Sequence, residues 1–369
     1  MKLRIAGRGW VTPLGSNVDK VWSQLLAGAG AAAQSISSEV SDRVYPIFRV
    51  PPAATADAPT HPRLRRSSAI SRFAVTAGLN ALREAGVTLD RDTAARTALV
   101  FATSNGGVIY TKRFYHDIVA SGAQAASPLL FPETVFNAPA SHLAAILGIT
   151  GATYTLVGDA AVSILALQMA ADLMQNTSLE HCLVVAAEEA DWLLCDAYRK
   201  WRLLRREPPV EPFGDRACGM ILSEGAGALL LSRNSGVEVR AIASGTNYAK
   251  RRDAAASVGK VYDALQNGVD LVVGSANGTF IDDAELSAIR KSYNSAAIYT
   301  PKPALGEGVA AAGIWQIICA AEALRCGHVP PVLNSLIGRG IRDLPGARSA
   351  VVSVCGLNQQ VAGLLLRRA

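Results

Sequence analysis

The chain has 369 residues, of which 50% are hydrophobic and only 6% aromatic, and this is enough apolar material to bury one large core or two fused ones. Its formal net charge of +6 favours an anionic partner. The basic residues do not alternate with aromatic ones and no nucleic-acid-binding module is present, so the sequence argues against nucleic acid and fits an acidic carrier protein at least as well.

Membrane insertion, secretion and metal binding are not indicated either. The longest apolar stretch, residues 309–321, is too short to span a bilayer and is expected to be a buried helix. The first ten residues have a strand pattern that runs into glycines, without the apolar core of a signal peptide. The six cysteines show no paired spacing and no nearby histidine cluster. We therefore expect a cytoplasmic protein with no membrane span, no metal and no cofactor.

Strand and helix patterns alternate along the chain, as is typical of an α/β fold. In chain order, the first part predicts a strand at residues 3–6, helices at 19–27 and 71–84, a strand at 97–102, a helix at 141–147, a strand at 154–157, a helix at 163–174 and strands at 183–187, 225–231 and 237–243. The second part predicts a helix that includes residues 262–265, a strand at 271–274, a helix at 283–291, a strand at 297–299, a long buried helix at 308–325 and strands at 349–354 and 363–366. Residues 38–66, rich in proline and polar side chains, are predicted to be a surface loop.

Five stretches spread over essentially the full length resemble the β-ketoacyl synthase family, and they occur in the family's order. They are GRGWVTPLGSN, SRFAVTAGLNALREAGV, FNAPASHLAAILGITGATYTL, PFGDRACGMILSEGAGALLL and GEGVAAAGIWQIICAAEALRCGHVPPVLN. The fourth is the most specific match. The resemblance implies a thiolase-like, five-layered αβαβα sandwich of two similar halves in one compact unit, which we place at residues 1–240 and 241–369. It also implies dimerisation through the strand that precedes the nucleophile.

The family's nucleophile is a cysteine at the N-terminus of a buried helix, where the helix dipole and backbone N–H groups activate the thiol and form an oxyanion hole. Its Thr-Ala-Cys motif falls here on residues 159–163, so that the threonine position is Asp159 and the cysteine position is Ala161. A shift of the register by one residue places Ala160 or Val162 there instead. None of these three side chains can act as a nucleophile.

Two histidines assist decarboxylation of the malonyl extender in the family, and a lysine supports the site. By resemblance the histidine positions are Asn277 and Glu307, while the lysine is kept as Lys302. Asparagine can donate a hydrogen bond but cannot shuttle a proton near neutral pH. A lone buried carboxylate is unfavourable, so Glu307 either stands isolated and repels a malonyl carboxylate or forms an ion pair with Lys302.

Other positions that the resemblance places around the substrate are Ser163, Thr279, Gly306, Cys355 and Gly356. The family's glycine-rich gating loop is altered here at residues 354–358, and the region 248–270 is shorter than usual. Cys355 and Cys218 could replace the lost nucleophile, but we favour the interpretation that both are small buried hydrophobic residues on strands.

The densest basic stretch of the sequence covers residues 198–206. Either it is the solvated face of a helix or it docks an acidic acyl carrier protein. The residues that would bind the carrier protein are Arg199, Lys200, Arg202, Arg205 and Arg206.

A family scaffold without the family's chemistry resembles the chain-length factors of type II polyketide and aryl polyene systems, which pair with a condensing ketosynthase. Glutamine is the usual replacement for the cysteine in that group, so alanine is a departure. Two other hypotheses remain open. The chain could act on an acyl thioester without a covalent intermediate, as a decarboxylase, hydrolase or acyltransferase that uses Asn277 and Glu307, or it could be a homodimeric acyl-binding protein.

Overall fold

The computed structural model describes residues 3–245, 247–265, 268–338 and 340–368. Ten strands form one sheet that consists of two halves. The strands of the first half are β1 (Leu3–Val11), β4 (Thr97–Thr103), β5 (Thr153–Val157), β6 (His181–Glu188) and β8 (Gly225–Ser232). Those of the second half are β9 (Val237–Ser244), β10 (Leu271–Val273), β11 (Ala297–Tyr299), β14 (Ser349–Cys355) and β15 (Val361–Arg367).

The two halves share one topology. The first runs β1-β8-β6-β4-β5 and the second β9-β15-β14-β10-β11, so each begins with two antiparallel pairings and continues with two parallel ones. They join where residues 3–5 of β1 pair with residues 237–239 of β9. We propose two similar halves on this basis. The division that we placed at residues 240 and 241 falls inside β9 and stays a prediction.

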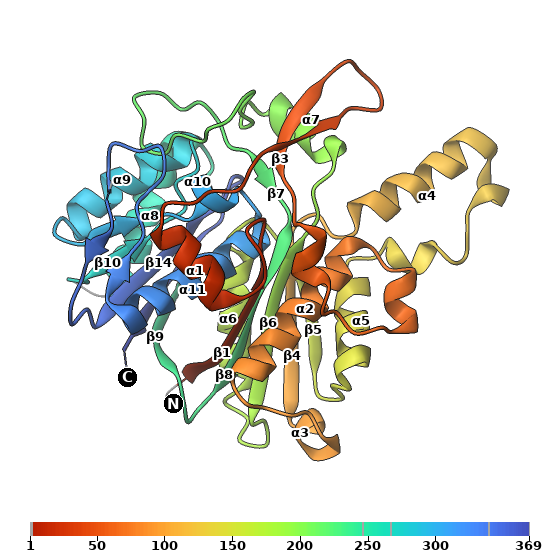
Figure 1. Ribbon diagram of the computed structural model, residues 1–369, viewed down its shortest axis with the longest axis horizontal. Coiled ribbons are helices and arrows are strands. Elements are labelled where there is room, and N and C mark those ends of the chain that lie inside the picture. Colours follow the sequence, from red (N-terminus) through yellow and green to blue (C-terminus); the bar gives the residue numbers. More distant parts are fainter. Residues whose placement is uncertain (1–2, 246, 266–267, 339, 369) are drawn as a thin grey trace.

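Helices separate and cover the two half-sheets (Figure 1). The outer layer on the first half contains α2 (Ala69–Glu84) and α5 (Ala138–Leu147), and that on the second half contains α8 (Ala254–Leu265) and α9 (Phe280–Ser292). Between the half-sheets lie α6 (Val162–Leu173) and α11 (Ala310–Cys326), and α11 contacts strands of both halves. Residues 310–324 of α11 are all buried, because this stretch is apolar apart from Gln316 and Glu322 and packs between the two half-sheets. The predicted α/β class and thiolase-like sandwich are thus confirmed.

The remaining elements are short or peripheral. They are α1 (Val18–Leu26), β2 (Gln34–Ser37), β3 (Val44–Phe48), α3 (Arg91–Ala95), α4 (Val108–Ser121), α7 (Trp192–Lys200), β7 (Leu222–Ser223), α10 (Lys302–Leu305), β12 (His328–Val329) and β13 (Arg342–Asp343), with five short 3-10 helices.

The prediction of a surface loop over residues 38–66 is wrong at β3. This strand pairs with β2 and, in parallel, with β7, and it buries Tyr45, Ile47 and Phe48. Its pattern of aromatic and β-branched residues was hidden by Pro46, which sits on a strand of only five residues. β3 matters for the site because β7, its neighbour, contacts the segment around Glu307.

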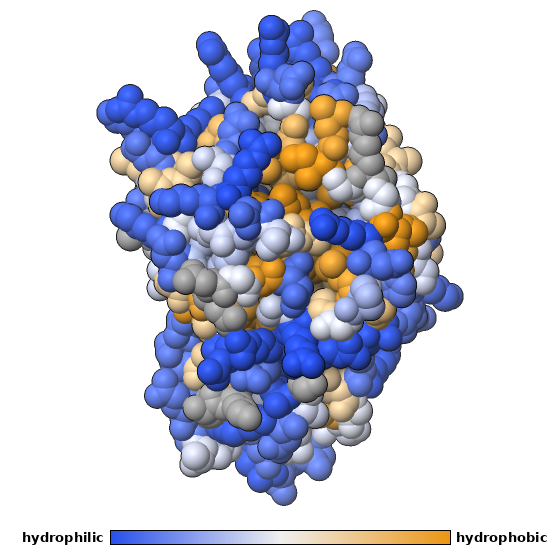
Figure 2. Space-filling view, turned by 90° about the vertical axis from the view of Figure 1, so that its left-hand side faces the viewer, coloured by the Kyte–Doolittle hydropathy of each residue, from blue (hydrophilic) through white to orange (hydrophobic). Residues whose placement is uncertain are grey.

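Helix α4 projects from the body of the molecule on the side where the edge strand β5 lies (Figure 1). The opposite face carries hydrophilic residues over most of its rim, with apolar residues gathered in its upper half (Figure 2). Among the described residues, no helix is long and apolar enough to cross a membrane.

The turn that leads into α4 is organised by the buried carboxyl group of Glu188 at the end of β6. It accepts hydrogen bonds from the backbone N–H groups of Ser104 and Asn105, the latter at 3.1 Å, and from the Asn105 side chain at 3.3 Å. Burial raises the pKa of Glu188 to about 8, although these donors oppose the shift.

We expect the free energy of unfolding to fall as pH rises from about 4.5 to about 8, because the folded chain holds the Glu188 proton more tightly than the unfolded chain does. Burial also raises the pKa of Glu189 and of Glu285 to about 7, which acts in the same direction. Glu188→Gln should therefore flatten this fall without abolishing it. Denaturant unfolding at several pH values measures the slope, with exposed Asp57→Asn as the control; an unchanged slope in Glu188→Gln would contradict the assignment.

Candidate functional site

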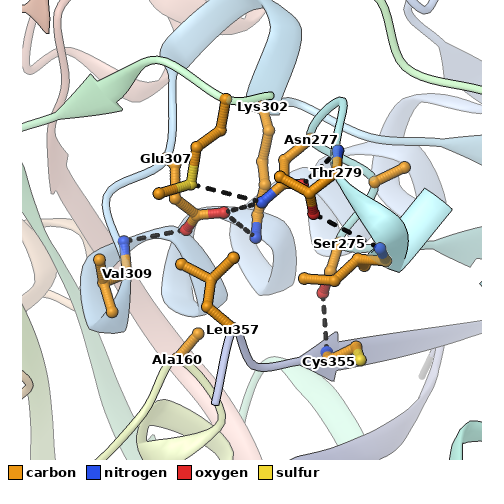
Figure 3. Close-up of polar contacts among 12 residues, drawn as sticks. Ala160, Ser275, Asn277, Thr279, Lys302, Glu307, Val309, Cys355 and Leu357 are labelled. Carbon is orange, nitrogen blue, oxygen red and sulfur yellow. Dashed lines mark hydrogen bonds and ion pairs between the residues drawn. The ribbon is translucent and has the colours of Figure 1, made fainter. Parts of the chain in front are cut away.

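A buried ion pair lies at the centre of the predicted site. Lys302, the first residue of α10, donates from Nζ to Oε2 of Glu307 at 2.6 Å, and both side chains are almost completely buried, with 2% and 0% exposed. Asn277, in the segment after β10, donates from Nδ2 to the same oxygen at 2.7 Å. Figure 3 shows the Lys302 and Asn277 side chains converging on the Glu307 carboxylate. Of the two alternatives for Glu307, the ion pair is confirmed.

The second oxygen of Glu307 is also occupied. Oε1 accepts from the backbone N–H of Val309 at 3.0 Å, and Val309 has a φ of 45°, a strained conformation for a β-branched residue. The Glu307 backbone bonds to Ile221 and Ser223 on either side, at 2.9 and 3.0 Å. Both carboxylate oxygens of Glu307 are thus engaged by donors.

Asn277 is held in one orientation. Its Oδ1 accepts from the Thr279 hydroxyl at 2.7 Å, and its backbone N–H donates to Asp282 Oδ1 at 2.8 Å. Gly278 follows with a φ of 88°, a conformation that favours glycine. Burial raises the pKa of Asp282 to about 6, although the hydrogen bonds that its carboxylate accepts from backbone N–H groups act to lower the pKa. The Asn277 amide does not transfer a proton near neutral pH, and its N–H holds the Glu307 carboxylate beside Lys302.

The predicted nucleophile positions, Ala160, Ala161 and Val162, carry only alkyl side chains, and all three are buried. Ala161 is the N-cap of α6 and is completely buried. Ala160, the alternative one residue earlier, is 1% exposed and lies beside Leu357 in Figure 3. Ser163 donates to the Ala160 carbonyl at 3.1 Å and packs against Gly313, so its hydroxyl is already used.

The other predicted substrate positions are enclosed by protein. Thr279 caps α9 and is 3% exposed. A Cβ on Gly306 would lie 2.6 Å from Ser223, and Gly306 has a φ of 81°. Cys355 is buried on β14, and burial raises its thiol pKa well above the ordinary value. Gly356 follows directly and touches the carboxylate of Asp159.

The expectation that both Cys218 and Cys355 are buried strand residues is wrong for Cys218, which is exposed in a loop. Sequence reasoning also gave no role to Asp159, whose carboxylate contacts the segment after β14. A signal was available, because an acidic residue stands alone in an otherwise apolar stretch just before α6. Among the described residues, no group of three or more His, Cys, Asp and Glu side chains is arranged to hold a metal ion.

The predicted docking residues lie at a surface hollow of about 510 Å³. The helical interpretation of the basic stretch is wrong beyond Lys200, because α7 ends there and Arg202 has a φ of 57°. Lys200 is exposed next to the hollow without lining it. Asp196 and Glu211 neutralise part of the charge through pairs with Arg43 and Arg205 at 3.4 and 3.2 Å. The lining residues are Arg43, Val44, Tyr45, Arg199, Arg202, Leu204, Arg205 and Arg206.

Comparisons with known proteins agree with this architecture. Residues 2–236 match the family model of the β-ketoacyl synthase N-terminal domain, and residues 233–335 match that of the C-terminal domain. Nodulation protein E of a Rhizobium species is 24% identical over 89% of this chain and 88% of its own length.

Two solved structures are similar over the full chain. The ishigamide ketosynthase/chain length factor has a TM-score of 0.88 at 19% identity, covering 100% of this chain and 99% of that one. A type II polyketide synthase acyl-carrier protein in complex with its ketosynthase, bound to the hexaketide, has a TM-score of 0.84 at 17% identity, with the same coverage. At these identities the likeness shows the fold.

Removing one partner of the buried ion pair should destabilise the chain strongly. We expect Glu307→Gln to lower the free energy of unfolding by about 3–5 kcal/mol, because Lys302 would be left as a buried charge without its counter-ion. The double variant Lys302→Met/Glu307→Gln should lose less than the sum of the two single variants.

Denaturant unfolding of the four proteins in this cycle tests the prediction. Glu180→Gln, at the exposed Arg96 pair, is the matched control and should change the free energy by less than about 1 kcal/mol. Strictly additive single losses would show that the two side chains are not energetically coupled.

Proposed function

This chain belongs to the β-ketoacyl synthase family, and we propose that it is a non-condensing subunit, a chain-length factor, that pairs with an active ketosynthase during polyketide, polyene or fatty-acid-type chain elongation. The observation that carries the proposal is the complete engagement of the Glu307 carboxylate by Lys302, Asn277 and Val309. The chain has the sheet and helices of a ketosynthase, while Lys302, Asn277 and Glu307 at the family's catalytic positions bond to one another.

The chemistry of decarboxylative condensation explains why this observation matters. The family forms a thioester on a cysteine and uses two imidazoles to assist loss of CO₂ and to stabilise the enolate. A methyl group at Ala160 or Ala161 forms no thioester, and the Asn277 amide transfers no proton near neutral pH. The Glu307 carboxylate is paired with Lys302 and also accepts from Asn277 and Val309, so it does not offer the donor that the family's second histidine provides.

A partner can be accommodated at the edge of the sheet. β5 hydrogen-bonds to β4 and ends the sheet on that side, and it exposes Tyr154 and Val157 by 42% and 51%. An unpaired strand edge favours strand addition from another chain. The projecting segment around α4 adds further exposed apolar side chains, which are Tyr115, Val119, Leu129, Phe131, Val135 and Phe136. Because the family dimerises through this strand, we assign the ketosynthase partner to this side.

The basic hollow supports contact with an acyl carrier protein. Arg199, Arg202 and Arg206 add positive charge to one concave surface, and acidic partners are steered to such surfaces by complementary charge. In the similar complex, an acyl-carrier protein is bound to its ketosynthase. For this chain we propose that the carrier protein of the same pathway docks at the hollow.

The proposal is tested by co-expressing the chain with the condensing ketosynthase encoded beside it, then combining native mass spectrometry with a malonyl-consumption assay. We expect a stable heterodimer that consumes malonyl groups, and no consumption by the chain alone. Val157→Asp should abolish the heterodimer, because a carboxylate buried in an apolar interface without a partner is unfavourable by several kcal/mol.

Leu336→Asp is the matched control, since Leu336 is equally apolar and 66% exposed but lies far from β5 in the sequence and on no strand of the large sheet. It should leave the heterodimer intact. A homodimer that turns over acyl thioester by itself would instead support the non-covalent enzyme, and a homodimer that binds acyl groups without turnover would support the acyl-binding protein.

Reversing charge at the hollow should weaken carrier-protein binding. We expect Arg199→Glu/Arg206→Glu to lower the affinity for the holo carrier protein about tenfold or more at low salt, and the difference should shrink as ionic strength rises. Fluorescence anisotropy with labelled carrier protein measures this. Arg91→Glu/Arg290→Glu changes net charge equally at exposed sites outside the hollow; an equal loss in both double variants would reject a specific docking site.

A further inference from the structure

The segment after β14, residues 356–360, separates an outer hollow from the buried ion pair. The hollow, of about 320 Å³, is lined by Trp201, Leu203, Tyr248, Ala249, Arg251, Leu357, Asn358 and Gln359. Leu357 also belongs to the inner side, because Figure 3 shows its side chain pointing toward Glu307 with Ala160 beside it. Only 6% of Leu357 is exposed. The segment therefore separates the surface hollow from Ala160, one of the predicted nucleophile positions.

Asp159 binds the 356–360 segment from its buried side. Its Oδ1 accepts from the backbone N–H of Leu357 at 3.2 Å, and its Oδ2 accepts from that of Asn358 at 2.7 Å. The Asp159 backbone N–H donates in turn to Oε1 of Gln360 at 3.0 Å. Three hydrogen bonds thus join the residue just before α6 to the 356–360 segment, which is about two hundred residues later in the chain.

Two further features fit the same closed position. Tyr248 donates from its hydroxyl to the Gly356 carbonyl at 2.7 Å and from its backbone to the Gln359 carbonyl at 3.0 Å. A Cβ on Gly356 would lie 1.9 Å from Asp159 Oδ2, so that only glycine lets the carboxylate reach the backbone here. Tyr248 therefore binds the 356–360 segment from the side of the surface hollow, and Asp159 binds it from the side of the buried ion pair.

In the register that places the family's cysteine at Ala161, Asp159 stands where the family motif has a threonine. A buried carboxylate is stable only while hydrogen-bond donors surround it. If the segment moved outward, Asp159 would lose the Leu357 and Asn358 N–H groups and keep only that of Ala160, at 2.8 Å. Opening would exchange these two hydrogen bonds for bonds to water and would also break the bond from Asp159 to Gln360, so the three bonds together favour the closed position.

We propose that Asp159 is a latch that holds the 356–360 segment closed over Ala160 and the Lys302–Glu307 pair, so that this subunit takes up no acyl thioester or pantetheine arm. Restoring a cysteine and two histidines would therefore not restore condensation while Asp159 holds the segment closed. This holds whichever protein the chain pairs with.

A thiol introduced at position 160 reports whether the closed 356–360 segment keeps reagents away from this position. In the full-length Ala160→Cys protein, we expect iodoacetamide to modify the introduced thiol about a hundredfold more slowly than the exposed Cys218, with both rates followed by peptide mass spectrometry. Adding Asp159→Asn should raise the ratio of the two rates about tenfold, because one acceptor of the backbone N–H groups is lost.

Two variants separate opening from other effects. Tyr248→Phe removes the outer hydrogen bond without changing charge, so a faster reaction in this background cannot come from an altered thiol pKa; we expect it to raise the ratio as well. Asp172→Asn, at an exposed carboxylate on α6, should leave the ratio unchanged. Should Asp159→Asn fail to fold, the Tyr248→Phe comparison decides.

The latch is overturned if the introduced thiol reacts as fast as Cys218 in the parent, or if neither latch variant changes the ratio. Either result concerns the isolated chain and leaves heterodimer formation untouched. Conversely, a slowly reacting thiol at position 160, in a chain that forms no heterodimer, would contradict the proposed function and support the latch.

Discussion

The buried Lys302–Glu307 pair is the interaction on which the rest of the site depends. Neither charge is accessible to water, so each requires the other and the donors around it. Asn277 supplies one of these donors and the backbone of Val309 another. The pair therefore fixes the segment after β10, the start of α11 and, through the Glu307 backbone, β7 and its neighbour β3.

The duplicated sheet explains why these segments meet. In each half the two parallel pairings direct the loops after the strands to one edge, so the loops after β10 and β14 and the start of α6 converge there. The central layer of α6 and α11 is apolar and closely packed, with Gly313 against Ser163. Polar groups that enter this region must be fully bonded, and Glu307, Asp282, Glu188 and Asp159 each accept several hydrogen bonds.

Much of this could be predicted from the sequence. The strands and helices of the large sheet have clear periodicity. The family resemblance identified Lys302 and Glu307, and an ion pair was one of the two alternatives for Glu307 because a lone buried carboxylate is unfavourable. β3 was missed since Pro46 interrupts its short pattern, and the end of α7 was missed because Arg202 adopts a positive φ that no local signal announced. The contact of Asp159 with residues 357 and 358 joins distant parts of the chain, so sequence pattern alone could not predict it.

The central claim is that this chain supports condensation without carrying the growing acyl group. Its most direct test is the intact mass of both subunits after the co-expressed pair is incubated with a malonyl- and acyl-loaded carrier protein and rapidly quenched. The account predicts an acyl adduct on the partner's cysteine-bearing subunit only, and none on this chain at any time point. An adduct on this chain, or product formation by this chain in the absence of its partner, would contradict the account.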